Sequence, residues 1–167
     1  MPLENIPQPE IIAISDSLRL RKYDGNYGIM LPGYQDPYVY QNSEGIFDDD
    51  KKPDLGYVKG MCEYLDKNGE MYFIEVMEND HFVSIGDVTV KPTNPPIAIW
   101  YEKYRGLGIG TAVMKAVIDR LKELGYSGIC GSTVYRWNVP SQKMHEKLGF
   151  RRVGENEKEY IYDLDIK

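Results

Sequence analysis

The stretch that decides the fold reads Tyr104-Arg105-Gly106-Leu107-Gly108-Ile109-Gly110-Thr111. It follows a short apolar run, residues 97–101, which is typical of a buried strand. After it, apolar residues recur at spacings of three and four as far as Leu124, and Gly125 stands where a helix C-cap belongs. The sequence therefore predicts a strand, then a loop with glycines at alternate positions, and then a helix.

A junction of this kind is suited to binding a phosphate group. The first turn of a helix has N–H groups without partners and carries the positive end of the helix dipole. Glycines let an anion approach those N–H groups, and Arg105 adds a positive charge beside them. Two familiar phosphate sites are excluded by spacing. A P-loop needs a Lys directly after a glycine, and a dinucleotide fingerprint needs Gly-x-Gly-x-x-Gly, whereas this loop has neither.

Two motifs resemble those of the GNAT N-acetyltransferase superfamily, whose donor is acetyl-coenzyme A. Residues 105–110 resemble its pyrophosphate-binding motif, Arg/Gln-x-x-Gly-x-Gly/Ala. Residues 138–150, Asn-Val-Pro-Ser-Gln-Lys-Met-His-Glu-Lys-Leu-Gly-Phe, resemble its second signature, Asn-x-x-Ala/Ser-x-x-Leu-Tyr/His-Glu-Lys-x-Gly-Phe. The two motifs come in the family's order, one strand apart, and together cover about residues 97–150.

The resemblance implies an α/β (α+β) fold in a single acetyltransferase domain over residues 1–167. Its mixed, mostly antiparallel sheet has six to seven strands, is splayed in the middle and carries helices on both faces. Acetyl-coenzyme A would lie in the gap, with its pyrophosphate on the glycine loop and its pantetheine arm along the strand before that loop. The coenzyme-binding residues implied are Ile99, Trp100, Tyr101, Arg105, Gly106, Leu107, Gly108, Ile109, Gly110, Thr111, Asn138 and Ser141.

Acetyl transfer to an amine needs a base for the amine proton, a donor for the tetrahedral oxyanion and an acid for the leaving thiolate. The resemblance implies that the oxyanion donor is a backbone N–H near Trp100. The family's acid is often a tyrosine at the position of His145, so His145 is the candidate catalytic residue. Residues 93–101 contain no acid, which leaves Asp87, Glu102, a water-mediated base or no base at all. The two carboxylates are expected to be ordinary surface or loop groups.

Composition sets the class of the protein. Of the 167 residues, 42% are hydrophobic and 28% are charged, as in a soluble globular protein. The chain shows neither an apolar run of ~18 residues nor the positive flank and apolar block of a signal peptide, which predicts a cytoplasmic protein without a membrane partner. The net charge of −6 argues against a nucleic-acid partner and favours cationic small molecules or basic peptides.

Cysteine and histidine give no sign of a metal site. Cys62 and Cys130 are far apart, and each stands in an apolar pattern, so both are expected to be small buried side chains. The only histidines are His81 and His145. We therefore expect neither a disulfide nor a bound metal.

The remaining elements follow from periodicity and from turn residues. Residues 11–14 suggest one edge pairing, and residues 24–53 suggest either a tyrosine-rich packed loop or a wall facing the substrate, with an acidic rim at residues 48–50. Residues 138–148 suggest a helix that ends in a Schellman turn at Gly149. Further strands are expected at 18–23, 71–76, 82–90, 128–135, 151–154 and 160–166, and a further helix at 55–65.

The sequence thus leads to two hypotheses. One is an N-acetyltransferase that moves an acetyl group from acetyl-coenzyme A to a primary amine of a small molecule or peptide, by direct attack in a ternary complex. The other is an acyl-coenzyme A binding module of the same fold without catalysis. The acidic charge makes a cationic amine the first expectation for the acceptor, and the last strand offers an edge for a homodimer.

Overall fold

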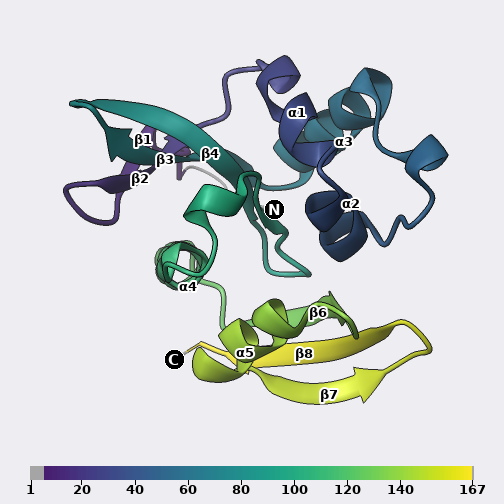
Figure 1. Cartoon of the computed structure of the whole chain (residues 1–167). Coiled ribbons are helices and arrows are strands. Elements are labelled where there is room, and N and C mark those ends of the chain that lie inside the picture. Colours follow the sequence, from purple (N-terminus) through teal and green to yellow (C-terminus); the bar gives the residue numbers. More distant parts are fainter. Residues whose placement is uncertain (1–5, 167) are drawn as a thin grey trace.

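The computed structural model describes residues 6–166 and contains two antiparallel sheets (Figure 1). The first has the order β1-β2-β3-β4-β5, and the second has the order β6-β8-β7. The strands are β1 (Ile11–Ala13), β2 (Leu18–Lys22), β3 (Glu70–Glu78), β4 (His81–Val90), β5 (Ile97–Ile99), β6 (Gly128–Tyr135), β7 (Arg151–Glu155) and β8 (Glu159–Asp165). The α-helices are α1 (Leu31–Tyr34), α2 (Pro37–Glu44), α3 (Leu55–Asn68), α4 (Ile109–Glu123) and α5 (Val139–Lys147), and the 3-10 turns are η1 (Tyr27–Met30), η2 (Asp49–Lys51) and η3 (Glu102–Tyr104).

Helices cover both faces of the first sheet. Side chains of β3 alternate between two cores, because successive residues of a strand point to opposite faces. Met71 and Phe73 pack with α1–α3, whereas Tyr72 and Ile74 pack in the core that contains α4. Figure 1 shows α1–α3 together at one side of the sheet and α4 at another.

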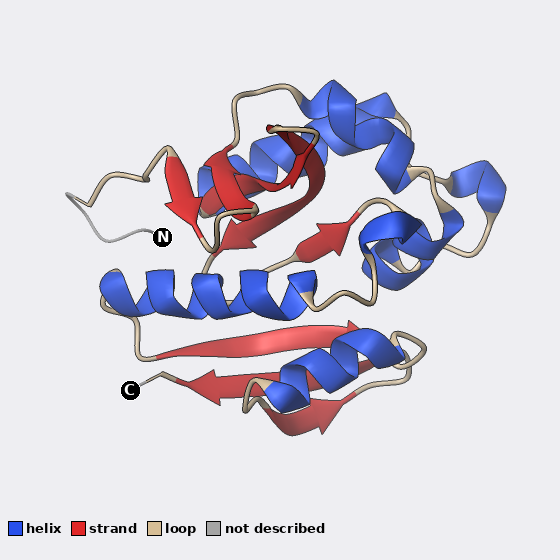
Figure 2. Cartoon of the chain, turned by 60° about the vertical axis from the view of Figure 1, so that its left-hand side comes forward, coloured by secondary structure: helices blue, strands red, loops and turns tan. Residues whose placement is uncertain are grey.

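Helix α4 joins the two sheets. Val113, Val117 and Leu121 lie on one of its faces, are fully buried, and share a core with Tyr72 of β3 and Tyr162 of β8. Figure 2 shows the helix running between the two groups of strands. The apolar stripe that the sequence predicts after the glycine loop is therefore the contact that holds the two sheets together.

The gap between the sheets begins beside the one backbone bridge that joins them among the described residues. Thr93 forms a parallel bridge with Cys130, supported by N–H bonds from Asn94 to the Cys130 carbonyl (3.1 Å) and from Cys130 to the Pro92 carbonyl (2.9 Å). Beyond it, the described residues show no pairing between β5 and β6. The splayed, mostly antiparallel α+β fold is confirmed, with eight strands in two sheets among residues 6–166 in place of six to seven in one sheet.

Three sequence expectations need correction. The last strand offers no edge for a homodimer, because β8 lies between β6 and β7. Residues 24–53 form a chain of short helices instead of a loop; Asp36 caps α2 by accepting from the Tyr38 N–H, with proline in the first turn. Cys62 is buried as expected, but Cys130 is exposed. Its neighbour Ile129 takes the core side of β6, so alternation directs Cys130 to the outside.

Other expectations are confirmed. Residues 11–13 pair with β2 as an edge strand. Gly149 has φ +92° and, with Phe150, donates to the Glu146 and His145 carbonyls, which completes the Schellman turn. Within residues 6–166, none of the helices combines the length and the apolar composition that crossing a membrane requires.

Candidate active site

A cleft of about 250 Å³ lies where the predicted coenzyme site should be. It runs between β5, the start of α4, the start of α5 and α2. Trp100, Tyr101 and Leu107 do not line it; Trp100 is fully buried, while Tyr101 and Leu107 are exposed. The predicted residues that do line it are Ile99, Arg105, Gly106, Gly108, Ile109, Gly110, Thr111, Asn138 and Ser141.

The glycine loop has the backbone shape that the motif predicts. Gly106 and Gly108 have φ of +72° and +82°, in the left-handed region that favours glycine, and Gly108 is the N-cap of α4. A Cβ atom built at either position would meet no atom within 4 Å. The space beside the loop is therefore open on the side where a ligand would approach the N–H groups of the helix.

Strand β5 offers one free edge to the cleft. The Trp100 N–H donates to the Ile85 carbonyl (2.8 Å), so Trp100 belongs to the ladder with β4 and its N–H is not free for an oxyanion. In an antiparallel ladder, alternate residues direct their N–H and C=O groups to opposite sides. Ile97 and Ile99 therefore direct theirs away from β4 and toward the cleft that they line.

The Arg105 side chain stabilises the loop. Its guanidinium donates to the carbonyls of Ile99 (3.2 Å) and Trp100 (2.9 Å) and lies 3.5 Å from an Asp36 carboxylate oxygen. It also stacks on the Tyr38 ring, 4.0 Å from the centroid. The side chain ties β5 to the start of α2, so the anion site at this position consists of backbone groups.

Asn138 bridges the mouth of the cleft. Its side-chain oxygen accepts from the Ser141 N–H (3.3 Å), which caps α5, and its amide nitrogen donates to the Asn42 carbonyl (3.4 Å). The neighbouring Trp137 indole donates to the Gln41 carbonyl (2.9 Å). Both side chains hold the end of α2 across the space between the sheets.

His145 is buried and fully hydrogen-bonded. Its Nδ1 lies 2.7 Å from the Ser141 carbonyl oxygen, which can only accept, so Nδ1 carries the proton. Its Nε2 then accepts from the Ser132 hydroxyl at 3.0 Å. Burial lowers the pKa of His145, with a partial offset from the bond to Ser141, so the ring is neutral near pH 7. Because its only N–H points at a carbonyl, the geometry favours a positioning role over that of an acid for the thiolate.

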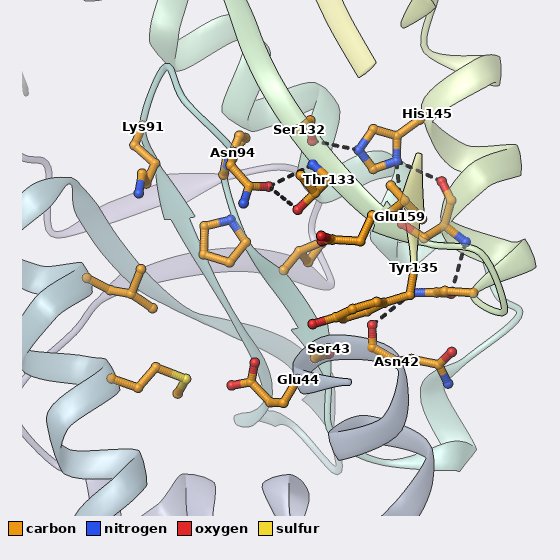
Figure 3. Close-up of a pocket in the computed structure, with 18 of the residues that line it drawn as sticks. Asn42, Ser43, Glu44, Lys91, Asn94, Ser132, Thr133, Tyr135, His145 and Glu159 are labelled. Carbon is orange, nitrogen blue, oxygen red and sulfur yellow. Dashed lines mark hydrogen bonds between the residues drawn. The ribbon is translucent and has the colours of Figure 1, made fainter. Parts of the chain in front are cut away.

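A second pocket, about 450 Å³ in volume, adjoins the cleft (Figure 3). Its lining mixes polar and apolar side chains, and its carboxylates are Glu44 at the end of α2 and Glu159 at the start of β8. Asp48–Asp50 lie outside it and are exposed, so the predicted acidic rim is formed by other residues. Five residues line both spaces, Asn42, Ser43, Ile97, Asn138 and Ser141.

Glu44 is the carboxylate nearest in sequence to those shared residues. Burial raises the pKa of Glu44 to about 7; the Tyr57 hydroxyl partly offsets this, and the charge of Asp87 adds to it. Figure 3 shows the Glu44 carboxyl projecting into the pocket beside the Tyr135 hydroxyl. A carboxylate that titrates near pH 7 in a pocket suits a general base.

Asp87 is buried beneath this pocket and is not the surface group expected from sequence. One of its oxygens accepts from both the Tyr34 hydroxyl and the Trp100 indole, each at 2.8 Å. Burial raises the pKa of Asp87 to about 6 in spite of both bonds. Tyr34 lines the pocket, so Asp87 reaches it through that hydroxyl. Glu102 lies in η3, is exposed, and lines neither space.

Residues 34–150 match the acetyltransferase (GNAT) family. The chain belongs to this family. It is therefore an N-acetyltransferase that takes its acetyl group from acetyl-coenzyme A. Among residues 6–166, no group of three or more His, Cys, Asp or Glu side chains is placed to hold a metal ion.

Solved structures show how widely the GNAT fold of this chain is shared. A domain from Methanocaldococcus jannaschii is 23% identical with a TM-score of 0.75, over 90% of this chain and 99% of that one. The microcin C7 self-immunity acetyltransferase MccE, solved with acetyl-CoA and AMP, is 15% identical with a TM-score of 0.70, over 93% and 96%. The Salmonella typhimurium putative acetyltransferase yncA, solved with acetyl-CoA, is 15% identical with a TM-score of 0.67, over 91% and 95%. None of the curated protein sequences matches the chain significantly.

Sequence reasoning did not single out two pocket residues of this GNAT acetyltransferase, Glu44 and Glu159. A signal for Glu44 was present, since Asp36-Pro37 is a typical helix start and Gly45 a typical C-cap. Glu44 is then a carboxylate at the negative end of a helix dipole, an unfavourable place that is often explained by function. Glu159 of β8 pairs with Tyr135 of β6, and no local sequence pattern indicates that pairing.

Proposed function

We propose that the protein acetylates a primary amine of a small molecule or peptide, by direct attack on acetyl-coenzyme A in a ternary complex. The observation that carries the proposal is the junction of two spaces, an anion-binding cleft and an acidic pocket, through five shared residues. A thioester at that junction would meet an amine from the acidic side without a covalent enzyme intermediate.

The donor would be held by backbone groups. The N–H groups of residues 106–111 would bind the pyrophosphate at the start of α4. The pantetheine amides would pair with the free edge of β5 at Ile97, in the manner of an added strand. The Ile99 N–H then replaces that of Trp100 as the candidate donor to the oxyanion, because the Trp100 N–H is already used by the sheet.

Glu44 would act as the general base. In the proposed step the Glu44 carboxylate takes one proton from the ammonium group, and the freed amine nitrogen forms a bond to the acetyl carbon as the carbon–sulfur bond breaks. The second nitrogen proton passes through water to the departing thiolate, so the coenzyme leaves as the free thiol. His145 would position the first turn of α5 and the Ser132 hydroxyl without exchanging a proton with the substrate.

The donor site is tested by a matched pair of glycine substitutions. Gly108 and Gly25 both have positive φ, +82° and +89°, and a Cβ atom at either meets no atom within 4 Å. Each change to Ala should therefore cost a similar ~1–2 kcal/mol of folding stability. Only Gly108→Ala places a methyl group where the pyrophosphate would lie, so calorimetry should show acetyl-coenzyme A affinity falling at least about tenfold for that variant alone.

Two results would overturn the proposal. If Gly108→Ala and Gly25→Ala bind acetyl-coenzyme A equally well, the glycine loop does not hold the pyrophosphate. If acetyl-coenzyme A binds but no primary amine in a broad panel releases free coenzyme A thiol, the proposed transfer to a primary amine is refuted.

A further inference from the structure

We infer that the acceptor is an aliphatic diamine, with its reacting amine at Glu44 and its second ammonium group at Glu159. The inference rests on the proposed function and specifies its substrate class. It is carried by the placement of the two carboxylates in one pocket, by their lack of ion-pair partners among the described residues, and by the tyrosine side chains that share the lining.

The two carboxylates come from different parts of the chain and face the same space. Glu159 of β8 is paired in register with Tyr135 of β6, so the two side chains share the face of the second sheet that borders the pocket. Glu44 enters from α2. Figure 3 shows both carboxyl groups projecting into the pocket, with the Tyr135 ring between them in that view.

Neither carboxylate is neutralised by the protein. Of the ion pairs among residues 6–166, none involves Glu44 or Glu159. Glu159 accepts a hydrogen bond at Oε1, from the Asn156 side chain at 3.3 Å. Two carboxylates in one pocket, neither of them in an ion pair, favour a ligand that brings positive charge.

The lining beside the carboxylates suits a hydrocarbon spacer. Tyr64 and Tyr135 line the pocket, and aromatic ring faces attract both methylene groups and a nearby ammonium. The one lysine of the lining is Lys91, whose ammonium lies 5.3 Å from the centroid of the Tyr64 ring. With two carboxylates against one ammonium, the lining carries a net negative charge, and this favours a dication over an amino acid.

The experiment compares three acceptors of matched length with acetyl-coenzyme A. They are 1,5-diaminopentane, pentylamine and 5-aminopentanoate, and free coenzyme A thiol is measured. We expect kcat/KM for the diamine to exceed that for pentylamine by roughly 10- to 100-fold, the range of one hydrogen bond to a charged group. Glu159→Gln should bring this ratio close to one. Glu157→Gln, an exposed neighbour outside the pocket, should leave the ratio as it is in the wild type.

The outcomes separate the two levels of the proposal. If pentylamine is used as well as the diamine, or if Glu159→Gln keeps the diamine preference, the second-cation site is refuted while acetyl transfer stands. If 5-aminopentanoate is preferred and Lys91→Ala removes that preference, the acceptor is a zwitterion and the diamine is refuted. If none of the three amines releases thiol, acetyl transfer to aliphatic amines fails, and the diamine acceptor fails with it.

Discussion

The substitution Glu44→Gln tests the proposed base through the pH dependence of the reaction. In the wild type, a pKa of about 7 leaves Glu44 about one-tenth ionised at pH 6 and about nine-tenths ionised at pH 8. An aliphatic ammonium is still protonated throughout this range. The value of kcat/KM should therefore rise about tenfold from pH 6 to pH 8 and then level off, because only ionised Glu44 can take the ammonium proton.

The pH profile of the Glu44→Gln variant should differ from that of the wild type both in the magnitude of kcat/KM and in its shape. Loss of a general base typically lowers the rate by roughly 10²- to 10⁴-fold. The variant can use only amine that has already lost its proton in solution, so log kcat/KM should keep rising by about one per pH unit without a bend near 7. Free thiol release at subsaturating amine, measured from pH 5.5 to 9, gives both profiles.

Control variants distinguish the titration of Glu44 from that of other groups. Glu44 is faced by Tyr57, Asp87 and Tyr135. Asp87, with a pKa of about 6, would place the bend one unit lower, and Asp87→Asn would remove it. Glu102→Gln, at an exposed carboxylate outside both spaces, should leave the wild-type profile intact. If Glu44→Gln loses less than about threefold in rate, or keeps the bend near pH 7, Glu44 is not the base.

Two further predictions concern stability. Burial lowers the pKa of His145, so the unfolded chain binds its proton more tightly than the folded chain does, and the wild type should lose stability as pH falls below ~6.5. Urea unfolding gives the free energy of unfolding of the wild type and of His145→Gln at each pH. The difference between them should shrink from pH 7.5 to 5.5 by up to ~1.4 kcal/mol per pH unit. A difference that stays constant would contradict a neutral buried ring. A Cβ at Gly86 would overlap the Ala98 carbonyl oxygen, so Gly86→Ala should destabilise the fold by ~1–3 kcal/mol. Gly60→Ala, in open space on α3, should instead stabilise it by about 1 kcal/mol. Thermal unfolding measures both effects. If both variants shift the melting temperature in the same direction, the close approach of β5 to β4 is not what destabilises Gly86→Ala.

Local patterns predicted the elements well because their signals lie within a few residues. The apolar stripe of α4, the positive-φ glycines around its start and the Schellman turn at Gly149 are all encoded in short windows. The fold class then followed from two motifs in the right order. The backbone shape of the candidate coenzyme site was predictable for the same reason, because a glycine loop before a helix is a local structure.

The acceptor half depends on contacts between distant segments, which no short window encodes. Asp87 reads as an ordinary polar residue of a strand, yet hydroxyl and indole donors from Tyr34 and Trp100 bury it. Arg105 reads as a phosphate ligand, yet two carbonyls, Asp36 and the Tyr38 ring occupy its guanidinium. In each case the partner lies in a segment whose position is fixed only by the tertiary fold.

The division of the site between two sets of segments has an evolutionary consequence. In the proposed function the donor is held mainly by backbone groups at the start of one helix, which most side-chain substitutions leave in place. The acceptor would instead be recognised by side chains such as Glu159 and Lys91, which line the second pocket and not the donor cleft. Single substitutions there can redirect the enzyme to new amines while its supply of acetyl groups stays the same.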